Sequence, residues 1–201
     1  MPTTATLQRR DNLRSRLVSI AEATIRVHGV KSLKARDLAS SAGCSVGAIY
    51  NVFGDLSDLI LVVNSRTFSK MGQDIAAVVA AKAGDPLDEL VGLSAGYLGF
   101  AQANTNQWRA LFDADVQKGD EAPDWYRDQL EGLFSEIGRR VEALHPKMSS
   151  EDVGLMSRAL FSTVHGMVTL GLEGRRSGIP LSELERMIGA SVRALAKTSS
   201  F

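Results

Sequence analysis

Residues 43–54, with the sequence GCSVGAIYNVFG, combine small residues with side chains that can hydrogen-bond to another molecule. Gly47 and Ala48 would let the backbone of a short helix come very close to a large partner. Tyr50 and Asn51 follow at once, and both can donate and accept hydrogen bonds. A helix that enters the major groove of DNA reads base edges with its first turns. The spacing therefore predicts a base-reading helix in this stretch.

The preceding residues supply the other half of a helix-turn-helix, over about 33–52. Ala39 is small enough for two steeply crossing helices to touch, and Gly43 accepts the positive φ that a tight turn requires. Ser45 can cap the second helix, and Phe53 can anchor that helix to the core. An αα-corner in a helical protein without a DNA partner would share these features, so the turn alone leaves both interpretations open.

The distribution of charge favours the DNA interpretation. The chain holds 23 basic and 23 acidic residues in 201, but residues 1–53 hold eight Lys/Arg against three Asp/Glu. A basic end on an acidic body is expected of nucleic-acid binding, although an ordinary solvated surface could carry the same charges. The arginines of 9–16 add to the expected phosphate contacts. The predicted DNA-binding residues are Lys34, Arg36, Ser45, Val46, Gly47, Ala48, Tyr50 and Asn51.

Apolar residues recur at spacings of three and four along nearly the whole chain, which is typical of amphipathic helices. No run of period two with β-branched residues occurs, so the sequence predicts an all-α fold. The predicted helices cover about 10–28, 35–42, 45–52, 55–83, 87–104, 106–117, 122–145, 150–174 and 181–198.

Residues 10–64 resemble the N-terminal domain of the TetR family of bacterial transcriptional regulators. The matching elements are a first amphipathic helix ending in HG, then RDLASSAG, then SVGAIYNVF, and Leu59 opening a linking helix. The resemblance implies a three-helix DNA-binding domain over 10–70, joined by a long helix to a larger helical ligand-binding and dimerisation domain over 71–201. It also implies a homodimer on a near-palindromic double-stranded operator.

The chain departs from the pattern of this family at three places. Leu33 and Lys34 stand where many members carry paired Ser/Thr, so the usual hydroxyl cap of the second helix is missing. Leu56 stands where many members have a lysine that contacts phosphate. A histidine or tyrosine is common where Asn51 and Val52 stand, so no base preference is carried over.

Aromatic residues and methionines gather in the middle helices. At helical spacing such residues are more often core, but together they could line a cavity for a small apolar or aromatic effector. The predicted ligand-binding residues are Phe68, Met71, Tyr97, Phe100, Trp108, Phe112, Trp125, Phe134 and His165.

The predicted helix over 150–174 is apolar on two faces, so both faces need cover. One face can meet its own domain, and a second copy of the chain can cover the other, although a buried helix in a monomer has the same pattern. The predicted dimer residues are Phe161, His165, Leu172, Ile188, Val192 and Leu195.

The sequence holds little that could support catalysis. It has no Walker-type or dinucleotide-type glycine loop and no Gly-x-Ser-x-Gly, and its one Glu-x-x-His pair, Glu142 and His145, lies at a predicted helix end. The single cysteine, Cys44, excludes an internal disulfide and multi-cysteine metal sites, and it is expected to be structural. We therefore expect no enzyme activity, no cofactor and no metal.

The sequence also bears on where the protein works. No apolar run follows the N-terminal arginines, and no stretch approaches the roughly 20 apolar residues of a membrane span. We expect a cytoplasmic, ligand-responsive DNA-binding regulator, most simply a repressor. The alternative is a helical module that binds a small molecule or docks a protein without binding DNA.

Overall fold

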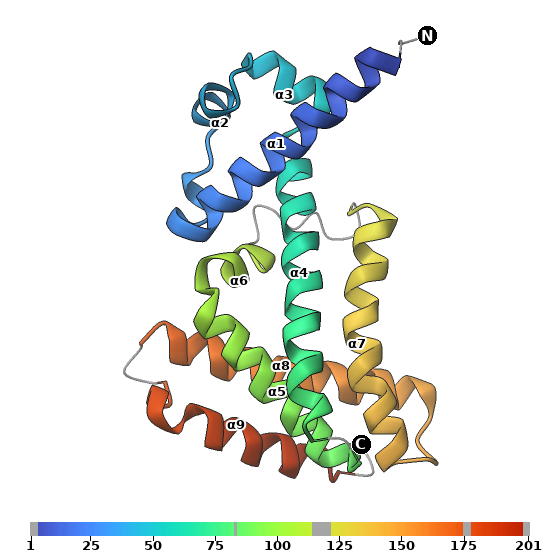
Figure 1. The fold of residues 1–201 in the computed structure, drawn as a ribbon. Coiled ribbons are helices and arrows are strands. Elements are labelled where there is room, and N and C mark those ends of the chain that lie inside the picture. Colours follow the sequence, from blue (N-terminus) through green and yellow to red (C-terminus); the bar gives the residue numbers. More distant parts are fainter. Residues whose placement is uncertain (1–3, 83, 114–121, 175–177, 199–201) are drawn as a thin grey trace. The chain divides into compact units, whose positions relative to one another are not determined.

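The computed structural model describes residues 4–82, 84–113, 122–174 and 178–198. Within these ranges all regular secondary structure is helical, so the predicted all-α class is confirmed (Figure 1). The elements are α1 (Thr4–His28), the 3-10 helix η1 (Val30–Ser32), α2 (Ala35–Ala42), α3 (Val46–Val52), α4 (Leu56–Ala80), α5 (Pro86–Ala103), α6 (Thr105–Leu111), α7 (Asp124–Leu144), α8 (Ser150–Leu172) and α9 (Leu181–Leu195).

Several helix ends differ from the prediction, two of them by more than three residues. Helix α1 begins at Thr4 rather than near residue 10, because its first turns bury no side chain and so carry no apolar periodicity. Helix α6 ends at Leu111, since Phe112 leaves the helical region at φ −116° and ψ 13°. The predicted continuation over 114–117 lies outside the described residues, as does Ala83, the predicted last residue of the fourth helix.

Side chains near the helix starts fix several boundaries by capping. Asp55 and Asp58 form a reciprocal capping box before α4: Asp58 N–H donates to Asp55 Oδ1 at 2.8 Å, and Asp55 N–H donates to Asp58 Oδ2 at 3.3 Å. Asp85 Oδ1 accepts from Asp88 N–H at 2.9 Å, ahead of the first-turn proline of α5. These helices therefore start where local sequence satisfies their free N–H groups.

The chain forms two compact units. One consists of Met1–Ser69 with Asn104–Tyr126, and the other of Lys70–Ala103 with Arg127–Phe201. Helix α4 contributes its N-terminal part to the first unit and its C-terminal part to the second.

The helix-turn-helix of the first unit packs on a group of apolar side chains. Leu17 and Ile25 of α1, Ile49 of α3 and Leu59 of α4 have no exposed surface. Helices α2 and α3 both pack on α1. Burying a side chain of this size contributes roughly 1.5–3 kcal/mol, so these few residues hold the helix-turn-helix together.

Helix α6 belongs to the first unit because two asparagines tie it there. Asn106 Nδ2 donates to the carbonyl oxygens of Arg26 and Val27, both at 3.1 Å, and so satisfies the last turn of α1. The buried Asn64 of α4 donates from Nδ2 to Ala110 O at 3.0 Å. These bonds link α6 to both α1 and α4.

In the second unit α5, α8 and α9 pack against one another. Leu184 and Ile188 of α9 are almost completely buried there. Two helices also come unusually close at Gly96 of α5, where a Cβ would lie 3.1 Å from Ile75 Cα of α4. Glycine is thus required at this crossing by the neighbouring backbone.

Two glycines of α5 test this close approach. Gly96→Ala should lower the free energy of unfolding by about 1 kcal/mol, because its methyl group meets the backbone of α4, which cannot yield as a flexible side chain would. Gly99 is the matched control, because it is exposed and a methyl group added there would meet no atom within 4 Å. Gly99→Ala should raise stability by about 0.5–1 kcal/mol through helix propensity. Urea denaturation of both variants measures this; equal stabilisation by the two changes would contradict the close crossing.

Candidate functional site

The turn between α2 and α3 has the geometry that the sequence predicts. Gly43 adopts the left-handed conformation at φ 61° and ψ 42°, and Cys44 N–H bonds back to Ala39 O at 3.0 Å. Ser45 caps α3, accepting from Ala48 N–H at 3.2 Å. The turn and the cap are therefore confirmed.

Helix α3 divides cleanly into a buried and an exposed face. Ile49 is fully buried, whereas Tyr50 is 46% exposed and Asn51 is exposed. A Cβ on Gly47 would meet only Ser45 Oγ, at 4.0 Å, so nothing blocks the backbone there. This face of α3 is therefore accessible to a binding partner.

Basic side chains are accessible in the same unit. Lys34 and Arg36 are both exposed at the start of α2, and Lys34 makes no side-chain cap, as expected from the missing hydroxyl. Arg14 of α1 lies over the ring of Phe53, with its Cζ 5.3 Å from the ring centre. Val46 and Ala48 lie on α3 and are half-buried.

The second unit contains a cavity of about 540 Å³ bounded by α4, α5, α7, α8 and α9. Its wall is mostly aliphatic, which suits an apolar small molecule. The lining residues are Met71, Gly72, Ile75, Ala76, Val79, Ala80, Glu89, Leu90, Leu93, Ser94, Tyr97, Leu133, Glu136, Ile137, Arg140, Leu160, Phe161, Val164 and Val192.

Some of the predicted ligand-binding residues gather at this cavity. Met71 and Tyr97 line it. His165 hydrogen-bonds to Tyr97, and Phe134 packs edge-on against the lining residue Phe161 with ring centres 5.3 Å apart. Phe100 is buried beneath Lys70, whose Nζ lies 5.5 Å from the ring centre.

The other predicted aromatic residues belong to the first unit. Phe68 is buried and packs edge-on against Tyr126, with ring centres 5.9 Å apart. Trp108 contacts Phe112, and Trp125 is 46% exposed. These residues form ring contacts within their own unit.

Tyr97 and His165 form a polar pair beside the cavity. Tyr97 Oη and His165 Nδ1 share a hydrogen bond of 2.8 Å, and the imidazole stacks on Phe161 with the rings inclined by 16°. Burial lowers the pKa of His165 below its ordinary value of 6.5, because the charged imidazolium loses its hydration. The neutral imidazole is therefore favoured in the folded protein.

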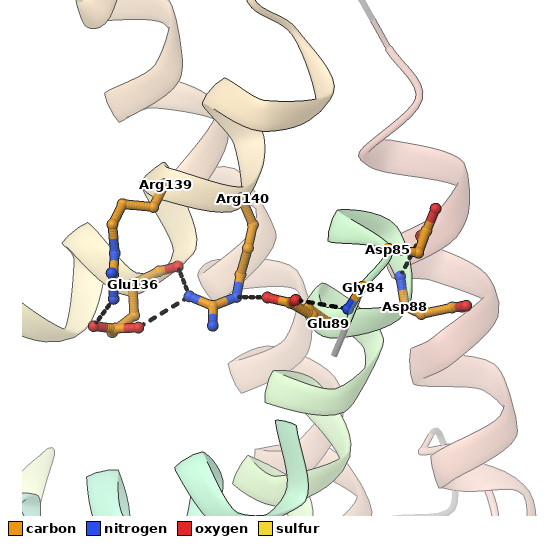
Figure 2. A network of polar contacts seen from close by, with 7 residues as sticks. All are labelled: Gly84, Asp85, Asp88, Glu89, Glu136, Arg139 and Arg140. Carbon is orange, nitrogen blue, oxygen red and sulfur yellow. Dashed lines mark hydrogen bonds and ion pairs between the residues drawn. The ribbon is translucent and has the colours of Figure 1, made fainter. Parts of the chain in front are cut away.

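At another part of the cavity wall, one guanidinium meets two carboxylates (Figure 2). Arg140 Nε lies 3.0 Å from Glu89 Oε2, and Nη1 lies 2.9 Å from Glu136 Oε2 and 2.6 Å from the backbone oxygen of Glu136. Glu89 Oε1 also accepts from Gly84 N–H at 3.3 Å, and Arg139 pairs with Glu136. The network thus joins α7 to the beginning of α5.

The charged state of Glu136 follows from this geometry. Burial by itself would raise the pKa of Glu136, but the hydrogen bonds from Arg140 and Arg139 outweigh it, so the pKa lies below its ordinary value of 4.5. Glu136 is therefore ionised throughout the neutral range.

Sequence reasoning missed the three charged lining residues. Charges on a predicted helix normally indicate its solvent face, and the spacing of Glu136 and Arg140 by four residues fits an ordinary surface pair. A signal was present in α5, where Glu89, Leu93 and Tyr97 recur every four residues and so share one face.

The predicted dimer residues occupy two kinds of environment. Ile188 and Val192 are buried within the chain, and Val192 lines the cavity. The remaining four, on α8 and at the end of α9, are half-buried: Phe161, His165, Leu172 and Leu195. Large exposed apolar residues on the same two helices are Leu155, Leu170 and Leu181.

Metal clusters and membrane spans are the two remaining kinds of site to consider. No group of three or more His, Cys, Asp or Glu side chains among the described residues could hold a metal ion. No single helix in those ranges is long and apolar enough to cross a membrane. Helices α3 and α4, which are bent by 61° relative to each other, together have the length and composition of a span, but by those two criteria only.

One family profile matches the chain over more than half of its length. This profile, described as "Tetracyclin repressor-like, C-terminal domain", matches residues 90–195, just over half of the chain. No curated protein matches the sequence.

Similar solved structures share the fold at low identity. A protein of unknown function from Rhodococcus sp. RHA1 has a TM-score of 0.72 and 22% identity, with 90% of this chain and 94% of that one covered. RolR in complex with resorcinol has a TM-score of 0.64 and 19% identity, covering 94% and 95%. A TetR-family transcriptional regulator from Streptomyces coelicolor has a TM-score of 0.66 and 18% identity, covering 92% and 80%.

The lowered pKa of His165 predicts a pH dependence of stability. The unfolded chain binds a proton on this side chain near pH 6.5, before the folded protein does, so folding stability falls as the pH drops below that value. Thermal unfolding at pH 7.5, 6.5 and 5.5 should therefore show a larger loss for the wild type than for His165→Gln. His28→Gln, at an exposed histidine of α1, controls for removal of a histidine in general. Parallel pH profiles for the wild type and His165→Gln would contradict the burial effect.

Proposed function

Because the chain belongs to the tetracyclin repressor-like (TetR) family of transcriptional regulators, we propose that it is a ligand-released repressor. In this proposal a homodimer binds a near-palindromic operator in the cytoplasm and leaves it when a small apolar or aromatic effector binds. The proposed DNA-binding domain covers residues 10–70, and the proposed effector and dimer domain covers 71–201.

The observation that carries the proposal is the exposed face of α3. Ile49 lies on the inner side of this helix, whereas Tyr50, Asn51 and the uncovered backbone at Gly47 lie on its outer side. A helix of this kind suits the major groove. The burial of Ile49 accounts for the inner face of α3 and does not by itself select small and polar residues on the outer face. DNA contact accounts for them.

The proposed contacts divide by chemistry. Lys34, Arg36 and Tyr50, with the arginines of 9–16, contact phosphate, since these groups are accessible and donate hydrogen bonds. Val46, Ala48 and Asn51 contact base edges, and the amide of Asn51 suits adenine.

The proposed dimer uses α8 and α9 from each subunit. Leu155, Leu170 and Leu181 are 41–55% exposed, and a four-helix contact between two copies would cover them. The half-buried residues Phe161 and Leu172 would extend that contact. The two DNA-binding domains of the dimer would then bind half-sites about one helical turn apart, or somewhat more.

The proposed effector site is the apolar cavity. The structure of RolR is a complex with the small aromatic molecule resorcinol, and that of EbrR is a complex with imidazole, which supports a small ring-shaped effector here. Ile75 and Val79 of α4 lie in the cavity wall. A ligand that fits only one orientation of α4 would change operator affinity by the ratio of its own affinities for the two orientations. Such ratios are typically about 5–150-fold.

The first test separates phosphate contact from base contact. Lys34→Ala should weaken binding to every DNA sequence, because one phosphate contact is lost. For the same reason it should reduce the slope of log affinity against log salt concentration by about one. Asn51→Ala should instead cost about 1–3 kcal/mol at one base position and relax preference there. Fluorescence anisotropy with single-base operator variants at several salt concentrations measures both. The base-reading role of Asn51 fails if its replacement weakens all operators equally, and the repressor assignment fails if a genomic selection yields no specific site.

A second test concerns the effector. Leu93→Trp should fill the cavity and abolish both thermal stabilisation by a panel of small aromatic molecules and operator release, while operator affinity is kept. The panel includes resorcinol and imidazole. Compounds that stabilise the wild type without changing its operator affinity would contradict release.

A further inference from the structure

The charges in this part of the cavity wall balance without any ligand, although the buried Arg140 Nε contacts Glu89 as an ion pair and without hydrogen-bond geometry. Arg140 meets Glu89 and Glu136, and Glu136 also meets Arg139, so two guanidinium groups balance two carboxylates. The Arg140 side chain is only 15% exposed and that of Glu89 23% exposed, whereas Arg139 is 65% exposed. The Arg140–Glu89 pair is therefore the sheltered part of the network.

Arg140 could bind an acidic ligand, but its Nε already pairs with Glu89. A guanidinium in a sheltered apolar site binds a carboxylate strongly, through charge-assisted hydrogen bonds. Here Glu89 Oε2 already lies 3.0 Å from Nε. A carboxylate that bound at Nε would have to displace Glu89 and leave that side chain without its counter-charge in a sheltered place.

We propose that Glu89 blocks Arg140 against acidic effectors, so that the cavity selects uncharged amphipathic molecules over carboxylates of the same shape. This inference rests on the proposed role of the cavity as the effector site. An uncharged hydroxyl or carbonyl group can hydrogen-bond to the network without breaking an ion pair. The aliphatic wall formed by Ile75, Leu93 and Leu160 then holds the apolar body.

A positively charged head group fits the same site poorly. Both carboxylates are engaged by arginines, and an ammonium group would lie beside the guanidinium of Arg140. Like charges at such a distance repel where water is largely excluded. Glu89 and Arg140 together therefore exclude both signs of charge.

The test compares three probes that differ only in the head group: 1-octanol, octanoate and octylamine. A second pair, 1-naphthol and 1-naphthoate, varies the shape of the apolar body. Titration calorimetry at pH 7.5 with the full-length wild type should give at least about tenfold tighter binding of each uncharged probe than of its charged counterparts. This comparison needs no variant.

Glu89→Gln should remove most or all of the preference for 1-octanol over octanoate. It keeps the shape of the side chain and frees the charge of Arg140, so affinity for octanoate should rise about tenfold or more while affinity for 1-octanol changes little. The double change Glu89→Gln with Arg140→Gln should abolish that gain. Asp88→Asn is the matched control, because Asp88 is a neighbouring acid on α5 that pairs with Arg193 outside the cavity lining.

Each outcome decides for or against this selectivity. Equal binding of octanol and octanoate by the wild type, tightest binding of octylamine, no gain of octanoate affinity in Glu89→Gln, or no binding of any probe to any variant would overturn it. Operator release by octanol is measured separately by anisotropy. If the charge selectivity holds but bound octanol leaves operator affinity unchanged, the release mechanism fails and the selectivity stands. If bound octanol releases the operator but the charge selectivity is absent, only the selectivity fails.

Discussion

Helix α4 keeps an unbroken hydrogen-bonded helix from Leu56 to Ala80, and both compact units include part of it. Its N-terminal part buries Leu59 in the core of the first unit, and its C-terminal part places Ile75 and Val79 in the cavity wall. Helix propagation is cooperative, so the turns of such an element stabilise one another. In the proposed mechanism, this one helix would couple the effector to the DNA.

The second unit combines close helix packing with a hollow centre. At Gly96 the absence of a side chain lets α5 approach the backbone of α4, and at Gly171 a Cβ would lie 2.5 Å from Leu184 Cδ2 of α9. Aliphatic side chains of the surrounding helices leave the cavity open between them. Because Arg139 and Arg140 balance the charges of Glu89 and Glu136, this part of the wall does not require a charged ligand.

Several features could be predicted from sequence because their cause lies within a few residues. Ser45 caps α3 through an N–H group three positions away, and Gly43 takes the φ that no other residue adopts as easily. The exposed start of α1 escaped prediction because Thr4 to Arg9 bury nothing. The sequence groups the aromatic residues and methionines as one set, but Trp108 and Met71 lie in different units, since helical periodicity identifies a buried face and not its partner.

The sequence by itself determined the helical class, the turn and cap of the helix-turn-helix and the small and polar residues of α3, because each depends on local hydrogen bonding or on the period of one helix. Only the tertiary structure decided which helices surround the cavity, which predicted residues reach it, and that Glu89 of α5 pairs with Arg140 of α7. Those outcomes depend on contacts between segments far apart in the chain, and a charged residue has the same appearance in a sequence whether its partner is water or a buried guanidinium.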